Sequence, residues 1–365
     1  MSSNSDSETY SLYPYHPSHV LPIVFAVLIG ISLVMHIYQN FRYKFWTVTF
    51  WMSWGGTVFT VGWIARCISS YQTSNVNLYI VQTVFIYAGP PIYSASAYNI
   101  LGRLLHYLPM HAPLHPNRVT IFFVYLGAAV ESLTASGAAR MATNTDSLSR
   151  YKSGGTLVST ALLLQAVIEA MVVSVIALVH YRASRAAHRP PPNVRKLCIT
   201  LYGTSFLIIF RCICRAVESF TLYASIESCK QGDCSPILTH EWYLYSFEAA
   251  PMVLFTYWLN IMHPGRLLPR QKTRYLDLDC KTERLGPGWI DKRSLWQTVI
   301  DPFDMSGMIS SKPNHESFWL WPEKWPAVVD GSFAQGTASN IQNSRSKPNE
   351  RSESGHKMLP SQSNP

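Results

Sequence analysis

The stretch that decides the fold is residues 197–222, LCITLYGTSFLIIFRCICRAVESFTL, an apolar run that carries three charges in its second half. A helix of this length is long enough to cross the hydrocarbon core of a bilayer. The charges are Arg211, Arg215 and Glu218, whose i, i+4, i+7 spacing places them on one helical face. Each would cost about 2.5–3.5 kcal/mol facing lipid at the centre of a span. The stripe must therefore face protein or water, which makes it the leading candidate for a functional site.

The composition predicts a membrane domain followed by a polar tail. Of 365 residues, 48% are hydrophobic and 14% are charged, whereas soluble domains carry roughly 25% charged residues. We expect an extracellular N-terminus (1–19), a membrane domain (20–262) and a mostly disordered tail (263–365). The net charge of +9 does not indicate a nucleic-acid partner, because the basic residues cluster between apolar runs.

Seven apolar segments predict an all-α membrane protein with seven transmembrane helices. They are residues 20–39, 45–65, 78–102, 119–139, 156–180, 197–222 and 242–262. Loops on the side of the N-terminus hold five Lys and Arg residues, against fourteen in the loops and the start of the tail on the other side. Because basic residues are retained in the cytoplasm, we expect the N-terminus outside and the C-terminus in the cytoplasm. The first span should serve as its own uncleaved insertion signal.

The cysteines and histidines predict one structural feature and no metal site. Cys229 and Cys234 lie in the predicted outer loop before the last span, where a small disulfide-closed loop is expected. The alternative is a pair of free thiols. No Cys/His cluster has the spacing of metal ligands.

Polar side chains fall inside other predicted spans as well. They are Glu131 in the fourth, Gln165 and Glu169 one turn apart in the fifth, and Glu241, Tyr245 and Glu248 on one face of the seventh. Since the sixth span runs outward and the seventh inward, Arg211 or Arg215 is expected to meet Glu248 near the middle of the membrane.

The charge balance inside the membrane leaves two interpretations open. Two arginines face four carboxylates, those of Glu131, Glu169, Glu218 and Glu248. Either some carboxyl groups are protonated or a water-filled cavity hydrates them, and both arrangements suit a transport pathway. The alternative is an ion-pair network that only fixes helix packing, which applies above all to Arg215 and Glu218 on the same helix.

Motifs for catalysis are missing, so we expect neither an enzyme nor a cofactor. The chain has no Gly-x4-Gly-Lys-Ser/Thr phosphate loop and no Gly-x-Ser-x-Gly elbow. His240-Glu241 fails as a zinc motif because Leu244 stands where a second histidine is needed. In the tail, the Trp-rich stretch 317–325 is expected either to lie on the membrane interface or to bind a partner, the alternative being no function.

Several motifs occur in a fixed order along residues 13–268. They are Tyr13-x-Tyr15-x-Pro17-Ser18, Gly62-Trp63-Ile64-Ala65-Arg66, then Gln82, Pro91, Ala95, Tyr98 and Gly102-Arg103, then Gln165, Arg211-x3-Arg215-x2-Glu218, His240-Glu241-x3-Tyr245, Pro251-Met252 and His263-Pro264-Gly265. In these motifs the chain resembles the fungal lipid-translocating exporters, an RTA-like family of seven-span proteins. Glu131 and Glu248 stand where that family has Asp.

The resemblance implies handling of lipids. Family members are associated with export of sphingoid bases across the plasma membrane, with porphyrin transport and with resistance to toxic amphiphiles. For the motif residues outside the charged stripes we expect structural roles; they are Arg66, Pro91, Tyr98, His263, Pro264 and Gly265.

We therefore expect a plasma-membrane exporter of an amphipathic lipid or toxic amphiphile, with the lipid and the bilayer as its partners. A seven-span receptor or sensor of such molecules is the alternative, although Asn99-Ile-Leu-Gly-Arg103 stands where receptors carry Asp/Glu-Arg-Tyr. A lipid hydrolase is a third class. The sequence identifies neither the substrate nor a partner of the tail.

Overall fold

Six long helices make up most of the protein. The computed structural model describes residues 13, 15–143, 148–187, 191–230, 236–289, 294–301 and 317–328, and every structural statement refers to these. The long helices are α1 (Leu21–Tyr43), α2 (Trp46–Tyr71), α3 (Val76–Tyr107), α4 (Pro116–Thr143), α5 (Leu148–Ala187) and α6 (Pro192–Lys230). Each contains one of the first six predicted spans.

The seventh span is assembled from shorter pieces. After α7 (Pro236–Thr239), the chain forms α8 (Trp242–Leu244), a π-helical turn η1 (Tyr245–Ala249) and α9 (Ala250–Ile261). The backbone N–H of Ala250 bonds to the carbonyl of Tyr245, five residues earlier, and Pro251 has no N–H to donate. The wider turn therefore includes Glu248, whose carboxylate is expected near the middle of the membrane.

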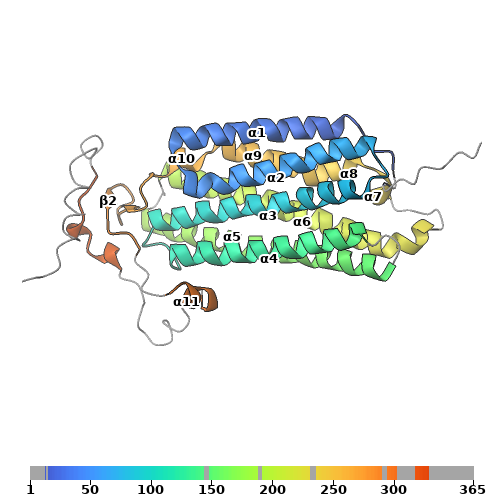
Figure 1. Cartoon of the computed structure of the whole chain (residues 1–365). Helices are drawn as coiled ribbons and strands as arrows, with labels where there is room; N and C mark the ends of the chain where they lie inside the picture. The colour runs from blue at the N-terminus through green and yellow to red at the C-terminus, as the bar shows by residue number, and fades with distance from the viewer. Residues whose placement is uncertain are drawn as a thin grey trace, which may run out of the picture. The chain divides into compact units, whose positions relative to one another are not determined.

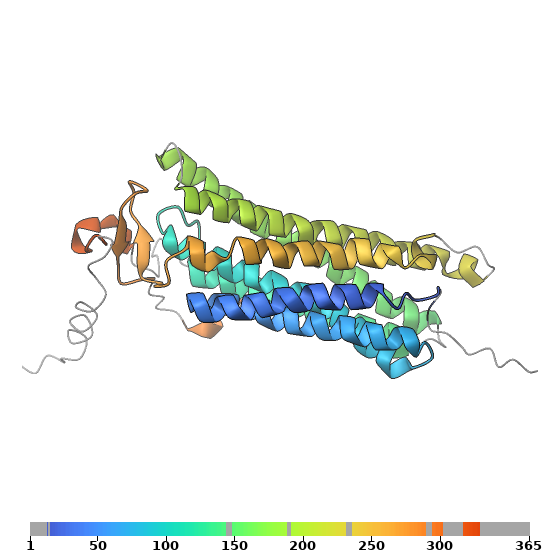
Figure 2. The same cartoon turned by 90° about the horizontal axis from the view of Figure 1, so that it is seen from above.

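The helices form a closed bundle in chain order. Each of α1 to α6 packs on the next, and α9 packs on both α6 and α1, which closes the ring. Figures 1 and 2 show the long helices running antiparallel, with α9 between α1 and α6. α3 also contacts α5 and α6, and nearly every side chain from Gly89 to Tyr107 is buried. The predicted all-α architecture of a membrane protein is thus confirmed.

The outside of the bundle is apolar, as a membrane protein requires. Four described helical stretches are long and apolar enough by themselves to cross a membrane, namely 21–43, 116–141, 152–186 and 192–221. α2 and α3 contain many Ser, Thr, Gly and Tyr residues, and the seventh span is divided into short helices. These three segments therefore do not meet the criterion of length and hydropathy. Large hydrophobic side chains such as Val34, Phe50 and Phe206 face outward with half or more of their surface exposed. The chain is an integral membrane protein.

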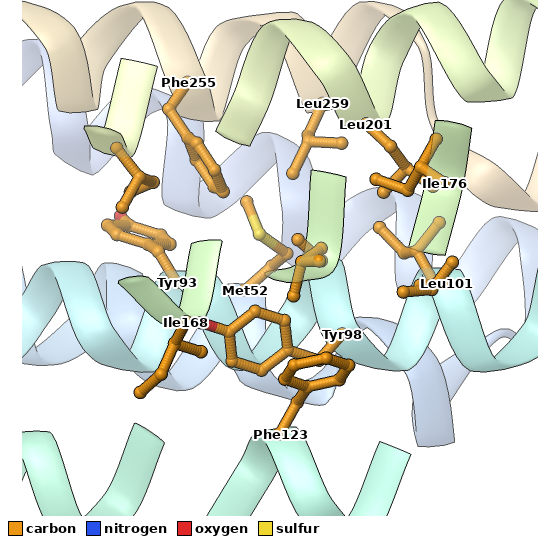
Figure 3. Packing of buried hydrophobic residues seen from close by; sticks show 14 of the residues in the cluster. Met52, Tyr93, Tyr98, Leu101, Phe123, Ile168, Ile176, Leu201, Phe255 and Leu259 are labelled. Carbon is orange, nitrogen blue, oxygen red and sulfur yellow. The ribbon is translucent and has the colours of Figure 1, made fainter. Parts of the chain in front are cut away.

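Aromatic and branched side chains fill the interior between the helices. Figure 3 shows Tyr93 and Tyr98 of α3 among Met52, Phe123, Ile168 and Phe255. Glycines permit the closest approaches, and a Cβ at Gly137 of α4 would lie 2.6 Å from the carbonyl oxygen of Gly154 in α5. The charged groups described below lie within this packed interior.

Part of the tail is folded, which the sequence does not predict. After α10 (Pro264–Leu267), strands β1 (Arg274–Leu276) and β2 (Glu283–Leu285) pair antiparallel, with Tyr275 opposite Arg284. The hydroxyl of Tyr107 at the end of α3 donates to Oε1 of Glu283 (2.8 Å), and Arg103 donates to the carbonyl of Pro269 (2.7 Å). These bonds tie the hairpin to the helix bundle.

The Trp-rich stretch lies against this hairpin. It forms two 3-10 turns, η2 (Phe318–Leu320) and η3 (Pro322–Lys324), and Phe318 packs at 5.2 Å between ring centroids on Tyr275. Arg284 donates to the carbonyl oxygens of Pro322 (3.1 Å) and Trp325 (2.9 Å). Hence one side of the stretch is part of a small folded unit, whereas Leu320 and Trp321 stay exposed.

Two predictions fall outside the described residues. Cys234 and the side chain of Cys229 are not described, so the expected disulfide between them stays a prediction. Residues 327–365 form a separate unit, of which only 327 and 328 are described, and the expected disorder after Gly331 likewise stays a prediction.

Candidate functional site

The centre of the site is an ion pair between α6 and the π-helical turn of the seventh span. Nη2 of Arg211 lies 2.5 Å from Oε1 of Glu248, and Nε of the same guanidinium donates to that oxygen at 2.9 Å. Both side chains are fully buried, at 1% and 0% exposure. The predicted meeting of the two helices through these charges is confirmed.

Arg215 joins the pair to a second carboxylate. It bonds to Glu218 on its own helix and to the hydroxyl of Tyr87 on α3. Its Nε lies 3.3 Å from Oε2 of Glu248, an ion pair without hydrogen-bond geometry. The side chain of Glu218 is 26% exposed, which makes it the only member of this charged cluster with access to the surroundings. Two arginines thus neutralise Glu218 and Glu248.

Glu169 of α5 lies next to this cluster without a cation of its own. It is buried at 1% exposure, and its Oε1 accepts a hydrogen bond from the hydroxyl of Tyr98 at 2.8 Å. Oε2 has no hydrogen-bond partner among the described residues. The thiol of Cys212 lies within electrostatic reach of both Glu169 and Glu248. A buried carboxylate whose described neighbours are neutral hydroxyl groups is costly, because no cation offsets the loss of water.

Gln165 lies one turn from Glu169 on the same helix and faces α3. Its Nε2 donates to the hydroxyl of Ser94 at 3.5 Å, and its side chain is buried. Ser94 also lies beside the carboxyl of Glu169. The two polar residues of α5 therefore share one polar contact region with α3, as their spacing predicts.

Glu131 of α4 is separate from the ion pairs. Its side chain is half-buried, and no hydrogen bond or ion pair joins it to the described residues. Gly127, one turn earlier on α4, lies against the ring of Tyr98, because a Cβ there would be 3.6 Å from that ring. Glu131 is thus at the edge of the face that α4 turns toward α3.

A second polar cluster lies at the predicted outer end of the bundle. Nη2 of Arg66 on α2 lies 2.6 Å from Oε1 of Glu241, and the hydroxyl of Tyr245 donates to the same oxygen at 2.9 Å. Both charged side chains are nearly buried, at 5% and 9% exposure. The stripe predicted on the seventh span therefore divides between two clusters, since Glu241 and Tyr245 pair with Arg66 whereas Glu248 pairs with Arg211.

The segment before α1 closes over this outer cluster. The hydroxyl of Tyr15 accepts from Arg66 (3.0 Å), and the backbone N–H of Ser18 donates to Oε2 of Glu241 (2.6 Å). Tyr13 is buried, with its hydroxyl bonded to Ser69 of α2 and accepting from Gln82 of α3. The N-terminal motif thus covers the end of the bundle and forms hydrogen bonds with Arg66, Glu241 and Gln82, which belong to the other motifs.

The remaining motif residues lie at helix contacts. Nδ1 of His263 accepts from the N–H of Gly265 (3.1 Å) and so caps α10, which begins at Pro264. A Cβ at Gly265 would lie 2.8 Å from Cβ of Tyr43, so only glycine fits at this contact without a shift. α3 continues without interruption through Pro91, which is buried.

Some members of the site could not be found from the sequence. Tyr87 contacts Arg215, and Ser94 contacts Gln165. Both are uncharged side chains in an apolar span, and only the packing of α3 against α5 and α6 reveals their role. Tyr98 occupies one of the family's motif positions, but the sequence does not show that its hydroxyl donates a hydrogen bond to Glu169.

Comparisons with known proteins find relatives across most of the chain. Residues 52–271 match the family model described as "RTA1 like protein", and the match runs from within α2 to the start of the tail. A Leptosphaeria maculans protein called lipid-translocating exporter-like protein RTA1 is 35% identical over 77% of this chain and 56% of its own length. An Ajellomyces capsulatus protein of the same description is 30% identical over 70% of this chain and 81% of its own length.

A yeast relative shows the same match. Protein RTA1 of Saccharomyces cerevisiae is 31% identical over 67% of this chain and 82% of its own length. No solved structure matches the chain. Because the family model matches more than half of the chain and about a third of the aligned residues are identical in these relatives, this chain is a fungal member of the RTA1-like protein family.

Proposed function

We propose that the protein is a membrane transporter that moves an amphipathic lipid or a toxic amphiphile across the plasma membrane and thereby confers resistance. Relatives named lipid-translocating exporter-like proteins and a probable lipid transporter support the lipid class. A protoporphyrin uptake protein, 27% identical over 53% of this chain, extends the class to other amphiphiles. The absence of catalytic motifs from the sequence favours a transporter over an enzyme.

The proposal rests on the carboxyl groups within the membrane domain that have no arginine beside them. Arg211 forms an ion pair with Glu248, and Arg215 forms one with Glu218. Glu131 and Glu169 therefore have no cation beside them among the described residues. Intramembrane carboxyl groups that no protein cation neutralises mark substrate or proton pathways. A protonated amine, such as that of a sphingoid base, has the charge that these groups lack. The cost of burying them argues against a purely structural role.

The proposal is tested by flux in proteoliposomes. The purified chain is reconstituted and offered a panel of sphingoid bases, sterol amines and porphyrins, and movement across the bilayer is followed for each. We expect faster movement of at least one class than in protein-free vesicles. A panel without any protein-dependent movement contradicts the proposal.

Glu131→Gln is the sharpest variant, because this side chain has no partner among the described residues and its replacement removes only a charge. We expect reduced flux with unchanged folded yield. Ser132→Ala is the matched control, since Ser132 is exposed next to it and bonds only to a carbonyl of its own helix. Glu169→Gln, which keeps an acceptor for Tyr98, should reduce flux as well.

A receptor or sensor is distinguished by the same panel. A receptor would bind an amphiphile and alter a cellular response in a strain carrying the protein without moving the compound in vesicles. Sensitivity of a deletion strain to the panel, together with the vesicle result, separates the two functions.

A further inference from the structure

A short helix in the tail has the features of a membrane-surface anchor. We propose that α11 (Leu295–Ile300) lies in the cytoplasmic interface of the bilayer and inserts Trp296 and Ile300 between lipid headgroups. This contact would hold the tail against the bilayer, whichever substrate the protein transports. The surface that α11 contacts is a lipid bilayer, not a protein.

The position of α11 places it beside a spanning helix. α11 contacts α4, although the chain reaches it only after the hairpin. In Figure 1 it lies below the end of the bundle where α4 begins. The charge distribution of the loops assigns this end to the cytoplasm. A segment flanking the first turns of a spanning helix is at the depth of the lipid headgroups.

The chemistry of α11 fits this depth. Its six residues, LWQTVI, include no charge, and Trp296 and Ile300 are one turn apart with 78% and 82% of their surface exposed. Two such side chains on one face are costly in water, whereas tryptophan is enriched at membrane interfaces. Among the described residues, none covers these two side chains.

Two backbone N–H groups at the start of α11 are bonded by side chains of the same segment. Oγ of Ser294 accepts from the N–H of Gln297 (3.3 Å), and Oε1 of Gln297 accepts from the N–H of Ser294 (3.1 Å). This capping box uses the one long polar side chain of α11 for its own backbone. A helix whose end groups are bonded in this way loses less when it leaves water for an interface.

The exposed charge of the described tail suits an anionic leaflet. Among the exposed described residues of 263–328, five are basic and two are acidic. The basic ones are Arg266, Arg270, Lys272, Lys281 and Lys324. The cytoplasmic leaflet carries anionic lipids that attract such residues near a membrane surface. Charge complementarity therefore favours lipid over a basic protein surface or a second copy of this positively charged tail.

The test measures the depth of α11 in proteoliposomes of phosphatidylcholine and phosphatidylserine. A fluorophore is attached to Ile300→Cys in the full chain, and the signal of the chain without the new cysteine is subtracted. Lys281→Cys, exposed in the hairpin turn, is the reference for a position in water. We expect lipids with a headgroup-level nitroxide to quench the label at 300 several-fold more than the label at 281. Iodide in the buffer should give the reverse order.

Two results would overturn the proposal. A label at 300 that iodide quenches as strongly as the one at 281 means that α11 is in water. A label shielded from both quenchers means that protein covers it. In the chain labelled at 300, Trp296→Ala should also weaken quenching by the lipid nitroxide, while Trp296→Phe should retain most of it, because the aromatic ring supplies the interfacial contact.

Discussion

The carboxylate of Glu248 lies 2.5 Å from the guanidinium of Arg211, with both side chains shut off from the surroundings. The pair joins the sixth and seventh spans at a π-helical turn, so it holds a locally weakened helix against its neighbour. A buried charge without its partner is far more costly than a buried pair. This relationship makes the centre of the membrane domain sensitive to single substitutions.

Glu248→Gln should therefore destabilise the fold. Arg211 would be left buried without a carboxylate, at a cost of about 3–5 kcal/mol. The measurement is the midpoint of thermal unfolding in detergent. Glu218→Gln is the control, because Glu218 is 26% exposed and Arg215 would still have Glu248 nearby. Equal losses in the two variants would show that burial of the pair is not what matters.

Exchanging the charges provides a second test of the same pair. Arg211→Glu combined with Glu248→Arg retains one positive and one negative side chain at the contact. The double variant should recover part of the stability that either single variant loses. A double variant no better than the sum of its single changes argues against a direct interaction.

The outer cluster predicts a local effect of another kind. Glu241→Gln removes the charge that attracts Arg66, and it weakens the acceptor of the Ser18 N–H. Hydrogen exchange of residues 13–19 should become faster, while the bundle retains its protection. His16→Ala is the control in the same segment, since His16 is exposed. Unchanged exchange in the Glu241 variant would show that other contacts hold the segment in place.

Close packing of α4 and α5 gives a prediction from sterics alone. Gly137→Ala would place a Cβ 2.6 Å from the carbonyl oxygen of Gly154, and backbone cannot move aside as a side chain can. We expect a loss of about 1–3 kcal/mol in the free energy of unfolding. Gly127→Ala, in the same helix, meets only the ring of Tyr98 at 3.6 Å and should be tolerated. Thermal unfolding of both variants checks the difference.

Acid should weaken the contact that follows the last span. Burial, and then the charge of Arg266, lower the pKa of His263 from 6.5 to about 4. The unfolded chain therefore binds a proton at pH values where the folded ring is neutral. Stability from this group is intact above about pH 6.5 and falls as the pH decreases toward 4. The shift corresponds to about 3 kcal/mol at most.

The pH prediction is checked with His263→Asn, which keeps an acceptor at the helix cap and has no titrating group. Midpoints of unfolding are compared between the two proteins from pH 7.5 to 4.5. The unmodified protein should lose stability faster over this interval than the variant. Parallel curves would mean that His263 titrates as it does in the unfolded chain.

The sequence predicts the bundle because membrane helices follow simple rules. Long apolar runs must become helices in lipid, and seven of them are visible without any knowledge of their neighbours. It also places Arg211 and Glu248 at similar depth, since depth follows from position along an antiparallel span. The folded hairpin of the tail escapes prediction because its stability comes from Phe318 and Arg284 contacts between segments far apart in the sequence.

By itself, then, the sequence determined the helical membrane fold, the family motifs and which charges cannot face lipid. Only the tertiary structure decided how those charges are paired. It paired Glu248 with Arg211 and Glu241 with Arg66, and it placed Glu169 beside neutral hydroxyl groups such as that of Tyr98. The physical reason is that a one-dimensional pattern fixes the depth and face of a side chain, whereas pairing depends on which helices are neighbours and on how each is rotated about its axis.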